Sequence, residues 1–349
     1  MSHLVQIGSA RPARDIPPPT AGGSSLLVDA FGRRLTYLRV SVTDRCNLRC
    51  LYCLPEGAAL PANDRDFLDP ERIERLVGTL VGLGIRQVRV TGGEPLVRKD
   101  ILEVVRRLRA LPGLEELALS TNGTELARLA GPLRDAGIDR VNVSVDTLDG
   151  ERFHQLTRRD ELERVWQGVE AALAAGFDPV KLNSVLLADH QPGDVDRLVD
   201  LTLERPLAVR FIEMMPTATN QHLQPGRFRS CDWVRSRVEA RHGALEPADP
   251  AVRTGPARSF RVPGAAGTIG FITPLSHTFC HDCNRLRVTA RGELRLCLFA
   301  DRTYPLRHLL HDRPALEREI LRVLAEKPAE HMLAQGDYGN LASFMEIGG

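Results

Sequence analysis

The sequence predicts an α/β protein built as an incomplete (βα)6 TIM-like barrel with a C-terminal α+β extension. Six short apolar runs rich in valine alternate with segments of helical periodicity, which is the pattern of parallel strands joined by helices. Polar or glycine-rich residues follow each of these runs. Because active sites of βα barrels lie at the carboxyl ends of the strands, this placement favours a barrel over a doubly wound sheet.

Local signals support each predicted element in turn. Asp69 can cap the first helix, Pro70 suits its first turn, and Gly84 ends it, while apolar residues recur every three or four positions in between. The same periodicity returns between residues 101 and 108. The six predicted strands occupy residues 38–42, 87–90, 116–119, 140–145, 180–187 and 207–212.

The pattern divides the chain into three parts. Residues 1–25 contain proline and glycine clusters without periodicity, so we expect a flexible lead-in. Residues 26–216 hold the six strand-and-helix units, and residues 217–349 lose this rhythm and are expected to cover the barrel as an extension. The elements predicted for the extension are strands near 259–262, 268–273 and 286–289 and a helix near 314–326.

Composition narrows the class of protein. The 349 residues carry 46 basic and 45 acidic side chains, so nothing indicates a general binder of nucleic acid or of membrane surfaces. No apolar segment approaches the length of a signal peptide or of a membrane-spanning helix. We expect a cytoplasmic protein, since six of its seven cysteines fall in two tight groups that suit metal binding better than disulfides.

The first group, Cys46, Cys50 and Cys53, directly follows the first predicted strand. Three thiolates at this spacing indicate an iron-sulfur site, because a four-iron cubane normally takes four thiolates and one iron would here lack a protein ligand. The alternative is a reduced structural loop or a zinc site. Zinc would need a fourth nitrogen or sulfur ligand nearby, yet no histidine occurs between residues 4 and 153 and the next cysteine is Cys231.

Gly92, Gly93 and Glu94 follow the second predicted strand. Two glycines let backbone carbonyls approach an amine closely, and the glutamate could support that ammonium group. By itself the sequence is compatible with an ordinary turn. In a chain whose first predicted strand is followed by three closely spaced cysteines, the Gly-Gly-Glu sequence after the second strand indicates a ligand site.

The second group is Cys280, Cys283 and Cys297. It also supplies three thiols, and here a zinc site stays open as an alternative, because His277 or His281 could provide a fourth ligand. Spacing by itself does not decide between zinc and an iron-sulfur cluster.

Basic residues stand out at two places. Arg285 and Arg287 alternate on a predicted strand and so face the same side, which beside a metal site suggests an anionic or purine ligand, with a solvated basic edge as the alternative. The chain has three lysines, Lys99, Lys181 and Lys327, and Lys181 lies inside an apolar strand. A strand-edge lysine with a solvated head is the ordinary interpretation of Lys181.

These motifs resemble those of a known family. The loop Cys46–Cys53 resembles the signature of the radical S-adenosylmethionine (SAM) superfamily, and Gly-Gly-Glu-Pro resembles its SAM-binding motif. The distal Cys-x2-Cys-x13-Cys, the sequence Asn-Arg-Leu-Arg within it and a chain that ends in Gly-Gly resemble the GTP 3',8-cyclase family, which begins molybdenum cofactor biosynthesis. The resemblance runs from about residue 26 to the last residue.

The resemblance implies a barrel with a 4Fe-4S cluster at each end of its channel. The first cluster would bind SAM, and the second, in the extension, would bind the guanine of GTP. A 5'-deoxyadenosyl radical from SAM would remove the ribose 3'-hydrogen, the resulting C3' radical would attack C8, and reduction of the cyclised radical would yield 3',8-cyclo-7,8-dihydro-GTP.

The resemblance also implies roles for individual residues. The cluster ligands are Cys46, Cys50, Cys53, Cys280, Cys283 and Cys297. The SAM contacts are Tyr52, Gly93, Ser144 and Met215. The GTP contacts are Arg39, Arg89, Ser120, Lys181, Arg285 and Arg287, with Ser120 at a position where the family often has threonine. Gly348 and Gly349 would enter the barrel mouth and help to set up hydrogen abstraction.

The implied partners are GTP, an external one-electron donor, and the next enzyme of the pathway, cyclic pyranopterin monophosphate synthase. A homodimer is the candidate assembly. Two other functions fit part of the pattern: another two-cluster radical SAM enzyme, or a ferredoxin-like electron carrier. A carrier would explain two clusters but not the glycine motif or the basic barrel mouth.

Overall fold

The structure is a computed structural model of the 349-residue chain. It describes residues 26–54, 66–217, 220, 228–248, 256–300, 302–337, 339 and 343–347. The predicted lead-in, residues 1–25, lies outside the described residues.

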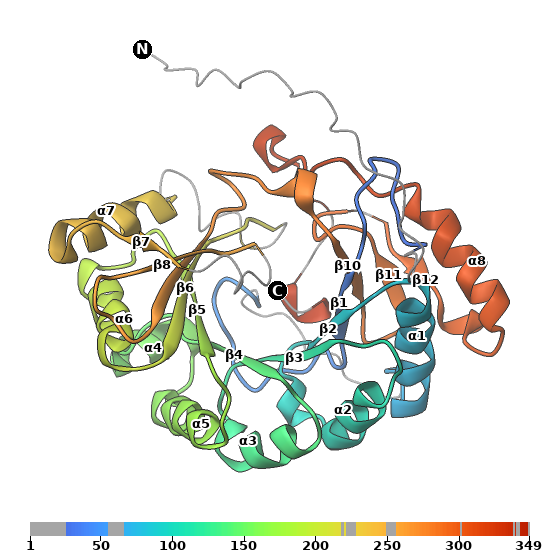
Figure 1. Ribbon diagram of the computed structural model, residues 1–349, viewed down its shortest axis with the longest axis horizontal. Helices are drawn as coiled ribbons and strands as arrows, with labels where there is room; N and C mark the ends of the chain where they lie inside the picture. The colour runs from blue at the N-terminus through green and yellow to red at the C-terminus, as the bar shows by residue number, and fades with distance from the viewer. Residues whose placement is uncertain are drawn as a thin grey trace.

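Six parallel strands form the centre of the molecule and confirm the predicted barrel (Figure 1). They pair in chain order, each with the next, so that their carboxyl ends meet at one mouth. The observed strands are β1 (Tyr37–Ser41), β2 (Gln87–Thr91), β3 (Glu116–Thr121), β4 (Arg140–Ser144), β5 (Val180–Leu186) and β6 (Leu207–Glu213).

Helices cover the outside of these strands (Figure 1). As predicted, the side chain of Asp69 caps the first helix by accepting from the amide of Arg72 at 2.8 Å. Apolar residues at helical spacing, such as Leu76 and Leu80, are buried against the sheet. The helices are α1 (Pro70–Leu83), α2 (Ile101–Arg109), α3 (Leu126–Asp135), α4 (Gly150–Thr157), α5 (Leu162–Ala174) and α6 (Pro192–Glu204).

The extension does more than cover the barrel, because it adds strands to both edges of the same sheet. β9 (Thr268–Ile272) runs parallel to β6, and β10 (Arg285–Val288) runs parallel to β1. The order is β12-β11-β10-β1-β2-β3-β4-β5-β6-β9-β8-β7. The remaining elements are β7 (Glu246–Pro247), β8 (Arg258–Arg261), β11 (Glu293–Arg295), β12 (Tyr304–Pro305), α7 (Cys231–His242), α8 (Arg313–Leu324) and the 3-10 turns η1 (Pro95–Val97), η4 (Cys280–Asp282), η5 (Arg307–Leu309), η6 (Leu333–Gln335) and η7 (Phe344–Glu346).

Side chains alternate between the two faces of each strand. Val40 and Val90 are buried beneath the helices, whereas Arg39 and Arg89, which pair in register, point into the barrel. The outer face of the sheet is therefore apolar and covered by helices, whereas polar side chains on its inner face line a cavity along the barrel axis.

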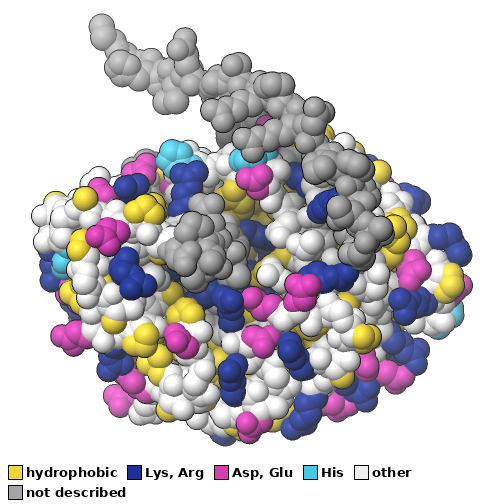
Figure 2. Space-filling view, in the orientation of Figure 1, with side chains coloured by type: hydrophobic (Ala, Val, Ile, Leu, Met, Phe, Trp, Pro, Cys, Tyr) yellow, Lys and Arg dark blue, Asp and Glu magenta, His cyan; other side chains and the backbone are white. Residues whose placement is uncertain are grey.

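Basic and acidic side chains are interspersed over the face shown in Figure 2. Within the described residues, no helix combines the length and the apolar character that crossing a membrane requires.

Candidate active site

The first cysteine loop leaves the carboxyl end of β1 and crosses the barrel mouth. Its turn is fixed by hydrogen bonds from the amides of Cys53 and Leu54 to the carbonyl of Cys50, at 3.0 and 2.9 Å. The guanidinium of Arg49 donates to the carbonyl of Cys46 at 2.6 Å. All three cysteines line one wall of a cavity, so the structure brings this predicted ligand set together.

Buried surroundings hold these thiols in their neutral form. Burial, with the carboxylate of Glu94, raises the pKa of Cys46 to about 11, and burial, with the neighbouring Cys46, raises the pKa of Cys53 to about 12. Burial and the other two thiols also raise the pKa of Cys50 well above its ordinary value. Such thiols become thiolates only beside a compensating positive charge, which cluster iron supplies. The set therefore fits a 4Fe-4S cluster with three protein ligands.

Gly92 and Gly93 pack directly beneath the cysteine loop. The amide of Gly93 donates to the carbonyl of Thr43 at 2.7 Å. A Cβ on Gly93 would lie 2.3 Å from the carbonyl oxygen of Arg45, and Gly92 has a φ of 148°. No larger residue fits this contact. The glycines thus line the same cavity as the thiols, as the sequence indicated.

Glu94 does not serve as expected. Its carboxylate was expected to support an ammonium group, but it accepts instead from the hydroxyl of Thr121 at 2.7 Å and from the amides of Leu96 and Asn122 at 3.0 and 2.5 Å. The side chain is fully buried, and burial raises the pKa of Glu94 to about 7. These three bonds give Glu94 a structural role, tying the glycine turn to the end of β3.

Tyr52 is held in place by Asp146, which follows β4. The phenol donates to Oδ2 of Asp146 at 2.7 Å, and the amide of Val185 donates to Oδ1 at 2.8 Å. Burial, with the adjacent Asp146, raises the pKa of Tyr52 well above its ordinary value, so the phenol keeps the proton that it donates. Tyr52 and Asp146 both line the first cavity.

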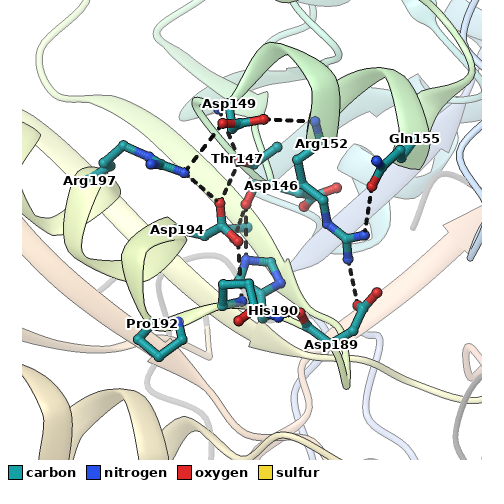
Figure 3. Close-up of polar contacts among 12 residues, drawn as sticks. Asp146, Thr147, Asp149, Arg152, Gln155, Asp189, His190, Pro192, Asp194 and Arg197 are labelled. Atoms are coloured by element: carbon teal, nitrogen blue, oxygen red, sulfur yellow. Dashed lines mark hydrogen bonds and ion pairs between the residues drawn. The ribbon is translucent and has the colours of Figure 1, made fainter.

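A second layer fixes Asp146 itself (Figure 3). The amide of Leu187 donates to Nδ1 of His190 at 3.3 Å, so Nε2 carries the ring proton and donates to the carbonyl of Asp146 at 3.0 Å. Asp194 lies in the same network, where it accepts from Thr147 at 2.8 Å. The position of Tyr52 therefore depends on a chain of buried polar contacts.

The first cavity continues into a second one along the barrel axis. Ser120, Asn183, Ile212 and Met215 line both cavities, so the two form one channel. Ser144 lines the first cavity at the end of β4. The predicted SAM contacts therefore surround a single space beside the first cysteine set.

Basic side chains surround the middle and far end of the channel. Tyr37 lies among them, accepts from Nε of Arg89 and was not predicted. Lys181 is not at a strand edge: it pairs in register with Asn142 and Ala208 in the interior of the sheet and is 1% exposed. The predicted residues that line the second cavity are Arg39, Arg89, Ser120, Arg285 and Arg287.

Among the described residues, no carboxylate lines the second cavity, and its arginines crowd together; Lys181 lies near them but is not among the residues that line either cavity. Burial, followed by the charge of Arg287, lowers the pKa of Arg39 well below its ordinary value. Burial, followed by Arg210 and other arginines, lowers the pKa of Lys181 to about 6. Arg210, which was missed in the sequence although it lies inside an apolar strand, has a pKa lowered to about 10 by burial and by Arg89. A multivalent anion would relieve this repulsion.

The second cysteine set closes the far end of the channel. Cys280 lies in η4, Cys283 lies two residues before β10, and Cys297 lies two residues after β11. The antiparallel pairing of β10 with β11 brings Cys297 back beside the other two, and all three line the cavity with Arg287. Burial disfavours the Cys283 thiolate, but Lys327 and nearby arginines outweigh it and lower its pKa.

The two histidines considered as zinc ligands contact carboxylates and do not line the cavity beside the second cysteine set. His277 lies 3.6 Å from a carboxylate oxygen of Asp232, and His281 lies 2.9 Å from Asp282 with most of its side chain exposed. Within the described part of the chain, no three His, Cys, Asp or Glu side chains are arranged to hold a single metal ion. His331, which was not predicted, does line the channel.

Glu213 joins the two halves of the site, a role that the sequence did not predict for this residue at the end of the sixth strand. From the end of β6 its carboxylate accepts from the amides of Leu275 and Ser276 at 3.1 and 3.0 Å and from that of Cys231 at 3.2 Å. The turn it holds leads into Cys280. Its fully buried carboxylate thus fastens the second cysteine segment to the barrel mouth.

The last described residues, 343–347, dock between the two cysteine sets. The hydroxyl of Ser343 donates to the carbonyl of Cys53 at 2.8 Å. Phe344 and Ile347 belong to an apolar cluster against which Cys53 and Cys297 pack. In the view of Figure 1 this segment, drawn in red, lies within the ring of strands. Gly348 and Gly349, predicted to act at the mouth, lie outside the described residues.

Comparison with known proteins identifies the family. A model of the radical SAM superfamily matches residues 40–202, and one described as Molybdenum Cofactor Synthesis C matches residues 207–333. The GTP 3',8-cyclase of Ectopseudomonas mendocina (strain ymp) is 44% identical over 328 residues, covering 93% of this chain and 98% of the relative. The chain belongs to the GTP 3',8-cyclase family. The cyclase of Pelotomaculum thermopropionicum agrees, at 43% identity over 325 residues and 92% and 99% coverage.

A solved structure supports the fold. Streptococcus suis SuiB bound to S-adenosylmethionine is similar to 89% of this chain, over 68% of its own, with a TM-score of 0.55 and 15% identity. Membership of the GTP 3',8-cyclase family confirms the predicted family and enzyme class, and with them the predicted cofactors, two 4Fe-4S clusters and SAM. It favours iron-sulfur clusters over zinc at both cysteine sets.

Proposed function

We propose that this chain converts GTP to 3',8-cyclo-7,8-dihydro-GTP, the first step of molybdenum cofactor biosynthesis. The observation that carries the proposal is one channel with a three-cysteine set at each end and crowded buried cations between them. The names of the closely related cyclases agree with it. A ferredoxin-like carrier has no need of the cationic channel.

At the first end, three thiolates leave one position of a 4Fe-4S cluster for SAM. Cys46, Cys50 and Cys53 would hold this cluster, which together with SAM would supply the one-electron chemistry for abstracting hydrogen from the substrate. The tight glycine turn brings backbone groups close to the same space, and Asp146 holds Tyr52 against it. The residues proposed to hold this cluster and SAM are Cys46, Cys50, Cys53, Tyr52, Gly93, Ser144 and Met215.

At the second end, the cations select a triphosphate and orient the nucleotide. Arginine forks match phosphate oxygens, and burial strengthens each contact because water does not screen it. The guanidinium of Arg285 lies 5.1 Å from the ring of Phe279, which fixes its direction. The residues proposed to bind the second cluster and GTP are Cys280, Cys283, Cys297, Arg39, Arg89, Ser120, Lys181, Arg285 and Arg287, together with Arg210.

The wider setting follows from the chemistry. Cleavage of SAM would consume one electron and reduction of the cyclised nucleotide radical a second, so an external one-electron donor is required. The product passes to cyclic pyranopterin monophosphate synthase, and we expect a reducing cytoplasm, where exposed clusters and free thiols persist. A homodimer is the assembly that we propose to test by light scattering.

The decisive assay uses GTP deuterated at C3' of the ribose. The anaerobically reconstituted protein, with SAM and dithionite, should release 5'-deoxyadenosine that carries the deuterium, together with cyclised nucleotide. ATP should give little product, because it lacks the O6 and N2 pattern of guanine. If SAM is cleaved but deuterium stays in the nucleotide, the chain is another radical SAM enzyme; if SAM is not cleaved at all, the carrier alternative gains support.

A further inference from the structure

Lys327 is a buried lysine that the function described so far does not use. It follows α8 and is 3% exposed. Its ammonium group donates to the backbone carbonyl of Arg285 at 3.2 Å and to that of Leu296. Arg285 begins β10, two residues after Cys283, and Leu296 directly precedes Cys297. One ammonium thus joins the two backbone segments that carry two of the second-set thiols.

The charges around Lys327 come mainly from that cysteine set. Burial lowers the pKa of Lys327 below its ordinary value; Cys283 and Cys297 oppose this shift by favouring the charged form, whereas Arg33 adds to it and Asp29 opposes it more weakly. Asp29 is already paired with Arg33, at 2.6 Å. Among the described residues, no carboxylate lies within ion-pair distance of Lys327. A buried ammonium without a carboxylate is costly unless another negative charge compensates it, and cysteines of the second set would provide that charge as the thiolate ligands of a cluster.

The choice of lysine fits this geometry. Of the 46 basic residues only three are lysines, and two of these, Lys181 and Lys327, are buried in the protein interior, whereas Lys99 is on the surface. A compact ammonium can direct its three donors to carbonyls on different segments.

Arg33 contacts the backbone of the residue that carries the third thiol, Cys280. Its Nη1 donates to the carbonyl of Cys280 at 2.8 Å and to that of Ala329 at 2.7 Å. The pairing with Asp29 balances the charge of Arg33 locally, so its contribution is mainly to geometry. Of these two cations, Lys327 is the one whose charge remains directed at the thiols, alongside Arg285 and Arg287.

We propose that Lys327 is a positioning and electrostatic residue of the second cluster, which fixes the segments carrying Cys283 and Cys297 and raises the reduction potential of the cluster bound to them. The inference rests on the proposed function, because it requires a 4Fe-4S cluster on the second cysteine set. Reduction adds one negative charge to a cluster. A fixed cation behind the thiolates therefore stabilises the reduced state relative to the oxidised one.

The test compares Lys327→Gln, which keeps a donor but loses the charge, with Lys327→Arg, which keeps the charge. Lys99→Met is the matched control on the surface. The readouts on the reconstituted full-length protein are iron per chain and the midpoint potential of each cluster, followed by electron paramagnetic resonance. Cys283→Ser identifies which signal belongs to the second set.

We expect the glutamine variant to lower the potential of the second cluster by at least about 59 mV, a tenfold change for a one-electron couple. Selective loss of iron from the second set, with the first set intact, supports the same role. Lys327→Arg should keep the potential close to that of the parent protein, as should Lys99→Met.

An unchanged second-cluster potential in Lys327→Gln, or equal iron loss from both sets, overturns the inference. An arginine variant that shifts as far as the glutamine variant contradicts the electrostatic role. A parent protein without any second-cluster signal contradicts the proposed function instead, so the two failures are distinguishable.

Discussion

Replacing Lys181 by methionine tests whether the channel is built for a polyanion. Methionine keeps the unbranched shape of the side chain but removes the ammonium group. In the folded protein, burial and the neighbouring arginines lower the pKa of Lys181 from 10.5 to about 6. The substrate-free protein therefore keeps a largely neutral lysine at physiological pH.

The expected change in the free energy of unfolding follows from the linkage between folding and proton binding at Lys181. Between pH 6 and 10.5 the unfolded chain holds a proton at this lysine that the folded chain does not, so the free energy of unfolding rises with pH across this window. Near pH 7.5 the lost proton costs the folded state about 4 kcal/mol, at about 1.4 kcal/mol per pKa unit. Lys181→Met removes this cost and should stabilise the substrate-free protein by up to that amount, with a flatter pH dependence.

GTP binding should reverse the effect, because the triphosphate favours the charged ammonium. Calorimetric titrations of GTP near pH 7.5, in two buffers of different ionisation enthalpy, should show uptake of about one proton per GTP bound. Lys181→Met should bind GTP more weakly and take up almost no proton, whereas the surface control Lys99→Met should match the parent. Unchanged proton uptake in Lys181→Met, or a variant less stable than the parent at every pH, would refute the reasoning.

Three further predictions concern the rest of the channel. Tyr52→Phe and Asp146→Asn each disrupt a buried charge-assisted hydrogen bond worth about 1.5–3 kcal/mol. Each variant should therefore raise the KM for SAM roughly tenfold or more at constant iron content. If the losses in the double variant are fully additive, the two residues are not coupled. Arg287→Ala should weaken GTP use by about 1.5–3 kcal/mol in steady-state assays while SAM binding persists, and an unchanged KM for GTP would leave Arg287 a structural role. Deleting Gly348 and Gly349 should preserve iron content but sharply reduce cyclised product on chromatography; equal yields would remove the tail from the mechanism.

Much of the fold could be predicted because local patterns determine it. The six strands are apolar runs bounded by turn residues, and α1 begins at Asp69 and Pro70 where capping predicts it. α7 was missed because only Cys231, Val234 and Val238 of its residues are buried, so it lacks a clear apolar face. The pairing of β10 with β1 has no local signal, since it joins segments far apart in the chain.

The candidate site divides in the same way. Cysteine spacing and the paired glycines were informative because such chemistry requires particular residues at fixed intervals. Arg210 carries the same signal as Lys181, a cation within an apolar strand, and could have been found. The roles of Glu213 and Lys327 depend on carbonyl and amide partners from distant segments. Glu94 was assigned wrongly because its spacing beside Gly93 does not reveal that its carboxylate turns inward.

The central claim is that one channel joins two iron-sulfur sites with different tasks. The most direct measurement compares Cys50→Ser and Cys283→Ser for iron content, for 5'-deoxyadenosine formed with dithionite, and for cyclised GTP. We predict that Cys50→Ser abolishes SAM cleavage, because the loss of one of three thiolates destabilises the cluster that holds SAM. Cys283→Ser should still cleave SAM but make no cyclised product. Cyclised product from Cys283→Ser at the parent rate, or undiminished SAM cleavage by Cys50→Ser, would contradict the account.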